Sequence, residues 1–172
     1  RRSLRLAVDD RELVARQIGR QPRAFRRVAV RCPWGMPAVT EQEPYGDDGA
    51  PFPTTYYLTC RHLVAAVSRI EAAGGVERWS AAVAADPDLR AEVERANAVQ
   101  RAVRHQLAGT RRGDDGGASL ELGVGGTGKA EQLKCLHAQV AFSLAHPGVG
   151  VGEHVLAELP GRWPGDRCCS QA

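Results

Sequence analysis

TTYYLTC, residues 54–60, is the strongest strand signal in the chain, because β-branched and aromatic side chains occupy it almost throughout. Directly behind it, apolar residues recur at helical spacing, which predicts a helix from Thr59 or Cys60 to about Ala73. A strand that leads straight into a helix fixes one junction of the fold. We therefore expect a sheet in the N-terminal third and helices after it.

The flanking segments extend this pattern. Residues 25–31 alternate apolar and basic side chains and predict a strand, a turn follows at residues 32–37, and residues 38–43 predict a second strand. Caps and apolar spacing predict further helices at residues 10–18, 76–84, 87–107, 130–145 and 153–159. The predicted class is α+β, with a small antiparallel sheet packed against several helices.

Length and composition favour a single domain. At 172 residues the chain is long enough for one hydrophobic core, and 43% of its residues are hydrophobic. We divide it into a basic N-terminal arm at residues 1–8, a domain at 9–160 and a C-terminal tail at 161–172. Within the domain, residues 109–128 hold eight glycines and predict an irregular, poorly ordered loop.

Positive charge is concentrated at the start of the chain. Residues 1–31 contain ten arginines and three acidic residues, an excess of seven positive charges against a net charge of +3 for the whole sequence. This asymmetry predicts an anionic partner or an acidic protein face, although a solvated arm has the same composition. No apolar run approaches the roughly 20 residues of a membrane span, and the Arg-rich start has no apolar segment. We therefore expect a cytoplasmic protein that does not enter the membrane.

Residues 123–129, GVGGTGK, fit the first part of a phosphate-binding loop, in which backbone N–H groups and a lysine surround a phosphate at the start of a helix. The next position needs Ser or Thr to bind Mg²⁺, and Ala130 stands there. The sequence also lacks the βαβ pattern of that fold. We predict no nucleotide cofactor and interpret the stretch as a glycine-rich loop.

Three cysteines lie at predicted element boundaries: Cys32 before a turn, Cys60 at the end of a strand, and Cys135 near the start of a helix. Such boundaries can meet at one end of a sheet. Thiolates bind zinc or iron–sulfur clusters, so these residues predict one shared metal site, completed by either His137 or a tail cysteine, Cys168 or Cys169. Single, widely spaced cysteines carry a weaker signal than paired knuckles, and small buried hydrophobic cysteines give the same pattern.

The pair Cys135 and His137 poses a geometric condition. Two residues apart on a helix, their side chains point roughly 200° apart, so they can share a metal only where the first turn is not helical. A third interpretation is nucleophilic catalysis by a thiol that the imidazole activates. No local signature supports that reaction, and the sequence names no substrate.

Three motifs in this order, RCPWGMP at residues 31–37, PFPTTYYLTC at 51–60 and KCLH at 134–137, resemble an actinobacterial family, the domain-of-unknown-function family 501. The resemblance covers about residues 10–160. It implies no activity, but Cys32, Cys60, Cys135 and His137 fall on its recurrent motifs, as does a cysteine near the C-terminus. That family often has a second histidine where this chain has Phe142.

Two functions remain open from the sequence. The first is a metal-binding protein that holds zinc or an iron–sulfur cluster through Cys32, Cys60, Cys135 and either His137 or a tail cysteine such as Cys168, with catalysis left undecided. The second is a non-enzymatic interaction module, in which the cysteines are buried core residues and the basic arm docks a partner.

Overall fold

A computed structural model describes residues 9–171, so the predicted basic arm at residues 1–8 lies outside the described residues. Three antiparallel strands, β1 (Phe25–Arg31), β2 (Pro37–Gln42) and β3 (Tyr56–Leu58), form one sheet in the order β1-β2-β3. The prediction of an α+β protein with a small N-terminal sheet is confirmed. No helix in the described part of the chain has the length and apolar character needed to cross a membrane.

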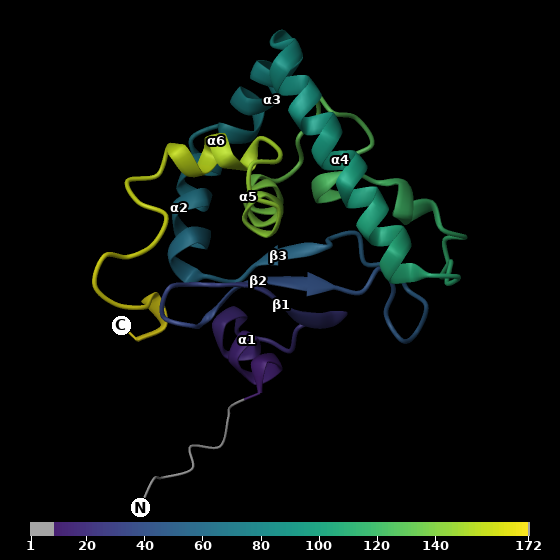
Figure 1. The fold of residues 1–172 in the computed structure, drawn as a ribbon, viewed down its shortest axis with the longest axis horizontal. Coiled ribbons are helices and arrows are strands. Elements are labelled where there is room, and N and C mark those ends of the chain that lie inside the picture. The colour runs from purple at the N-terminus through teal and green to yellow at the C-terminus, as the bar shows by residue number, and fades with distance from the viewer. Residues whose placement is uncertain (1–8, 172) are drawn as a thin grey trace, which may run out of the picture.

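Helices cover both faces of the sheet (Figure 1). Helix α1 (Asp10–Ile18) packs on one face, against β1 and β2, and α5 (Leu136–Ala145) packs on the other. The remaining helices lie on the side of α5: α2 (Arg61–Ala72), α3 (Gly75–Ala85), α4 (Pro87–Ala108) and α6 (Gly152–Ala157). Every residue of the central strand β2 is buried, as expected for a strand covered on both faces.

Capping residues explain where two of these helices begin. Asp9 accepts a hydrogen bond from the Arg11 N–H at the start of α1, and Asp86 accepts one from the Asp88 N–H at the start of α4. Pro87 occupies the first position of α4, where its missing N–H costs nothing. These starts follow from local sequence alone, and the structure confirms the predictions for both.

Helix α5 is the centre of the core. Eight of its ten residues are buried, because α2, α6 and the sheet surround it. Apart from Gln139 and Ser143 these buried side chains are apolar, and a helix with so few polar positions must be enclosed in this way. Its neighbour α6 approaches so closely that a Cβ on Gly152 would collide with the carbonyl of Gln139, so only glycine fits at that contact.

The glycine-rich segment differs from the prediction. It contains two short 3₁₀ helices, η1 (Ala118–Glu121) and η2 (Val124–Gly126), and Leu120 and Val124 are buried. The side chain of Asn97 on α4 accepts a hydrogen bond of 2.9 Å from the Val124 N–H. Buried apolar side chains and a buried polar contact hold this segment against α4, which its composition alone does not reveal.

The stretch that resembled a phosphate loop has another geometry. Helix α5 begins at Leu136, so no helix starts directly after Lys129. The Thr127 hydroxyl lies 2.7 Å from the carbonyl of Lys129 and 2.8 Å from that of Gln132, and this closes a turn in the intervening residues. A phosphate loop depends on free N–H groups at a helix start, and this segment supplies none there.

Part of the N-terminal positive charge is neutralised within the fold. Glu41 on β2 is almost completely buried, and Arg27 binds it with two hydrogen bonds of 2.8 and 2.9 Å. Arg26 contacts the same carboxylate at 3.1 Å, and Arg31 pairs with Asp10. A buried carboxylate needs such partners. These arginines therefore stabilise the sheet in addition to contributing positive charge at the surface.

Arg104 connects three segments around the sheet. Its side chain is fully buried, and its guanidinium donates hydrogen bonds to the carbonyls of Ser119, Phe52 and Pro53 and to the hydroxyl of Thr55. Burial lowers the pKa of Arg104. The contacts link α4 to η1 and to the loop before β3. The acceptors of Ser119 and Thr55 are buried, so Arg104 is the partner that satisfies them.

Replacing Arg104 by Ala should lower the free energy of unfolding by at least about 3 kcal/mol, because the buried acceptors of Ser119 and Thr55 lose their donor and a large buried side chain is removed. Urea unfolding measures this change. Arg95→Ala, at an exposed position of the same helix, is the matched control and should change the free energy by less than about 0.5 kcal/mol. Equal effects at the two positions would show that Arg104 does not organise these loops.

Candidate metal centre

Cys135 precedes α5 rather than lying within it. Its backbone is extended, with φ −157° and ψ 119°, and α5 starts one residue later, at Leu136. The predicted helix start at residue 130 is therefore wrong. The Leu133 N–H bonds to the hydroxyl of Ser80 and the Leu136 N–H to the carboxylate of Glu71, so contacts with α3 and α2 replace the first helical turn.

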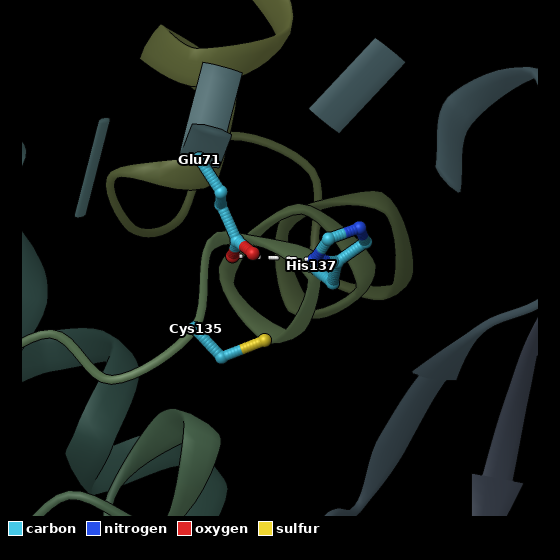
Figure 2. A group of neighbouring side chains, drawn as sticks. All are labelled: Glu71, Cys135 and His137. Carbon is cyan, nitrogen blue, oxygen red and sulfur yellow. Dashed lines mark ion pairs between the residues drawn. The ribbon is translucent and has the colours of Figure 1, made fainter. Parts of the chain in front are cut away.

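This late start meets the geometric condition on Cys135 and His137. With Cys135 outside the helix, its side chain and that of His137 converge on the carboxylate of Glu71, which comes from the last turn of α2 (Figure 2). Donor atoms of the three residues all lie within 4.8 Å of one another. The sequence supplied two members of this group, and the fold adds the third.

Glu71 makes two contacts with the start of α5. Its Oε1 accepts a hydrogen bond of 2.6 Å from the Leu136 N–H and lies 3.2 Å from Nδ1 of His137. The first N–H groups of a helix have no partner inside it and carry a partial positive charge. Since Cys135 provides no side-chain cap, Glu71 fulfils that role from another helix.

Both ring nitrogens of His137 have partners, Nδ1 in Glu71 and Nε2 in α2. The Nε2 atom lies 3.0 Å from the hydroxyl of Ser68 and 3.2 Å from the carbonyl of Val64, both on α2. A hydrogen bond with Cys135 raises the pKa of His137, burial opposes this, and the charge of Glu71 raises it further, to about 9. These contacts therefore favour a proton on the imidazole at neutral pH.

A cavity of about 330 Å³ opens beside this group. Cys135 and His137 form part of its wall, and β3 and α2 supply most of the remaining wall, with the aromatic ring of Tyr56 among the lining side chains. The apolar lining and the few polar groups at one end are typical of a small-molecule site.

The other predicted ligands lie elsewhere. The sulfur of Cys32 is 3.9 Å from that of Cys168, and the sulfur of Cys60 is 3.7 Å from that of Cys169. Cys60 caps the first turn of α2, whereas Glu71 stands in its last turn, roughly 16 Å away along the helix at 1.5 Å per residue. The structure thus brings Cys135 together with His137, and Cys32 with Cys168, but separates the two groups by the length of α2.

Sequence reasoning missed Glu71. It belongs to no motif and lies 64 residues before Cys135. One signal was present, since an acidic residue in the last turn of a helix faces the negative end of the helix dipole. Such a residue needs a positive partner from another element, and here the first turn of α5 provides it.

A sequence model for the family "Protein of unknown function (DUF501)" matches residues 28–157, and the chain belongs to this family. Glu71, Cys135 and His137 of the candidate centre, and the strand β3 that lines the adjoining cavity, all fall within the matched residues. No curated protein and no solved structure matches the chain.

Tyr56 lines the cavity, and His146, directly after α5, contacts the Tyr56 hydroxyl. Burial and the neighbouring Glu41 raise the pKa of Tyr56 to about 12, so its hydroxyl keeps its proton. Nε2 of His146 lies 2.9 Å from this hydroxyl, and the imidazole stacks on Phe142 with a centroid distance of 4.8 Å. Burial lowers the pKa of His146, which favours its neutral form.

His146 should therefore make the fold less stable in acid. Its folded pKa lies below the unfolded value of about 6.5, so the unfolded chain binds more protons as the pH falls. The contribution of neutral His146 is complete above that value and is lost as the pH drops through the folded pKa. His146→Gln should flatten this part of the stability profile, measured by urea unfolding at a series of pH values. An unchanged profile in this variant would contradict the assignment.

Proposed function

We propose that the protein binds one zinc ion through Glu71, Cys135 and His137 and keeps a fourth coordination position open toward the adjoining cavity. The observation that carries this proposal is the convergence of the three donor atoms within 4.8 Å from two separate helical elements. Ligand atoms of a tetrahedral zinc ion lie roughly 3.3–3.8 Å apart. Ion binding would draw the three donor atoms, which already lie within 4.8 Å of one another, to that spacing.

The donor types support zinc. A thiolate, an imidazole and a carboxylate are all common zinc ligands, and the two anionic groups together balance the charge of a divalent ion. An iron–sulfur cluster needs several thiolates, and Cys135 is the single thiol in this group. Among the metals that the sequence left open, the composition of this centre favours zinc.

The surroundings of His137 also fit a ligand. A metal-binding histidine usually donates its second ring N–H to a backbone carbonyl or a carboxylate, which fixes the tautomer. Here Nε2 faces the carbonyl of Val64 and the hydroxyl of Ser68, which leaves Nδ1 for the ion. α2 therefore orients the imidazole toward the centre before any ion binds.

The same geometry disfavours a catalytic cysteine. In a nucleophile–histidine–acid triad, the nucleophile and the acid contact opposite nitrogens of the imidazole. In Figure 2 the carboxylate of Glu71 and the sulfur of Cys135 lie on the Nδ1 side of the ring, while Nε2 is engaged by α2. Three groups around one point suit an ion better than a proton relay.

The cavity supports an open coordination position. Structural zinc sites carry four protein ligands, whereas catalytic ones have three and a water or substrate. A small ligand in the cavity, placed between β3 and the start of α5, would reach the fourth position, and the ion would act on it as a Lewis acid.

Zinc titration of chelator-treated protein tests the proposal. The expected result is one equivalent bound to the wild type, with a loss of affinity of at least 100-fold in Cys135→Ser and His137→Ala and of about 10–100-fold in Glu71→Gln, because metal affinity depends on each donor. Zinc should also raise the melting temperature of the wild type and protect Cys135 from alkylation.

Cys169→Ser is the matched control, since that thiol lies at the other end of α2 and should leave this zinc site intact. Wild-type affinity in the Cys135 and His137 variants would rule out the centre. A protein that binds no metal in any form would instead leave the interaction-module interpretation standing.

A further inference from the structure

The C-terminal segment brings two neighbouring cysteines to two different partners. Cys168 contacts Cys32, which follows β1, with 3.9 Å between the sulfurs, and Cys169 contacts Cys60, which precedes α2, with 3.7 Å. The partners are 136 and 109 residues away along the chain. Contacts between thiols from three distant segments arise from the fold, and chain proximity does not explain them.

The four thiols do not surround one point. No three of their sulfurs lie within 4.8 Å of one another in the described residues, as the ligands of a single ion would. Each member of the adjacent pair Cys168 and Cys169 faces its own partner instead. Two separate dithiol pairs describe this arrangement better than a single tetrahedral site.

The pair of Cys60 and Cys169 is asymmetric. Cys60 is buried, and burial raises the pKa of its thiol to about 12, whereas Cys169 is partly exposed. Burial also raises the pKa of Cys169, but a hydrogen bond from the backbone N–H of His62, together with the thiols of Cys60 and Cys168, lowers it below the ordinary value. The accessible thiol of the pair is therefore the one with the lowered pKa, and a neutral thiol lies in contact with it.

We propose that Cys169 and Cys60 form an oxidisable dithiol whose oxidant is a hydroperoxide, and that the resulting disulfide fastens the C-terminal segment to the start of α2. Oxidation-sensitive cysteines combine an accessible thiolate with a second thiol within reach, and this pair has both properties. The buried pair of Cys32 and Cys168 lacks an exposed thiol and stays reduced in the same reaction.

The oxidation needs no redox partner other than the two thiols and the peroxide. The Cys169 thiolate attacks the terminal peroxide oxygen, the O–O bond breaks, and the alcohol leaves with a proton from solvent, so that Cys169 becomes a sulfenic acid. The sulfur of Cys60 then attacks that of Cys169, the S–S bond forms, and the hydroxyl group leaves as water with the proton of the Cys60 thiol. Two electrons pass from the two thiols to one hydroperoxide.

Hydrogen peroxide treatment of the full chain, followed by digestion and mass spectrometry without reductant, tests the proposal. The expected product is a Cys60–Cys169 linkage that dithiothreitol reverses. Cys169→Ser should abolish it, and Cys60→Ser should leave Cys169 to over-oxidise to the sulfinic acid, because its resolving thiol is missing. The oxidised wild type should melt at a higher temperature than the reduced protein and resist proteolysis near its C-terminus.

Cys135→Ser separates this proposal from the zinc centre. The variant should form the same disulfide at the wild-type rate, whatever happens to its zinc. A linkage between Cys168 and Cys169, preferential oxidation of Cys135, or zinc that is lost in Cys60→Ser and retained in Cys135→Ser would each overturn the dithiol assignment. The last result would assign the four cysteines to a metal instead.

Discussion

The contact between Glu71 and the first turn of α5 determines much of this structure. One carboxylate oxygen accepts the N–H of Leu136 and pairs with the imidazole of His137, so it joins the end of α2 to the start of the central helix. The free N–H groups and dipole of α5 make an anion favourable at that position. Without it, the first turn of α5 would have a buried unsatisfied donor, and the three donor atoms would not converge.

Packing around α5 keeps this contact in place. The helix is buried on nearly all sides, and its neighbours come from distant parts of the chain. Arg104 fixes the loop before β3 from one side, and Glu41, with its arginine partners, fixes β2 from the other. The cavity beside Cys135 is lined by Thr54 and Tyr56. Arg104 binds Thr55 between them, and Glu41 accepts a hydrogen bond from the Tyr56 hydroxyl, so the shape of the cavity depends on hydrogen bonds as well as on apolar packing.

Local chemistry made much of the fold predictable. Asp9 and Asp86 mark helix starts through caps that act over three residues, and the alternation in residues 25–31 marks a strand. The start of α5 was not predictable in this way, because side chains of Ser80 and Glu71, 53 and 65 residues earlier, bind the N–H groups that would otherwise extend the helix. Local patterns contain no information about such partners.

The residues of the candidate site also differ in whether the sequence could predict them. Cys135 and His137 could be named from the sequence because they are close in it, while Glu71 could not. The cysteines show the limit of reasoning from element boundaries: Cys60 and Cys135 both lie at boundaries, but at opposite ends of α2, so they do not meet. Cys168 and Cys169 find partners only because the C-terminal segment returns to the sheet and to α2.

The most direct measurement of the central claim is an anomalous difference map, collected at the zinc absorption edge, from crystals of the zinc-loaded protein. The account predicts a peak within about 2.0–2.3 Å of the Cys135 sulfur, a nitrogen of His137 and a carboxylate oxygen of Glu71. A peak among Cys32, Cys60, Cys168 and Cys169, with none beside His137, would contradict it.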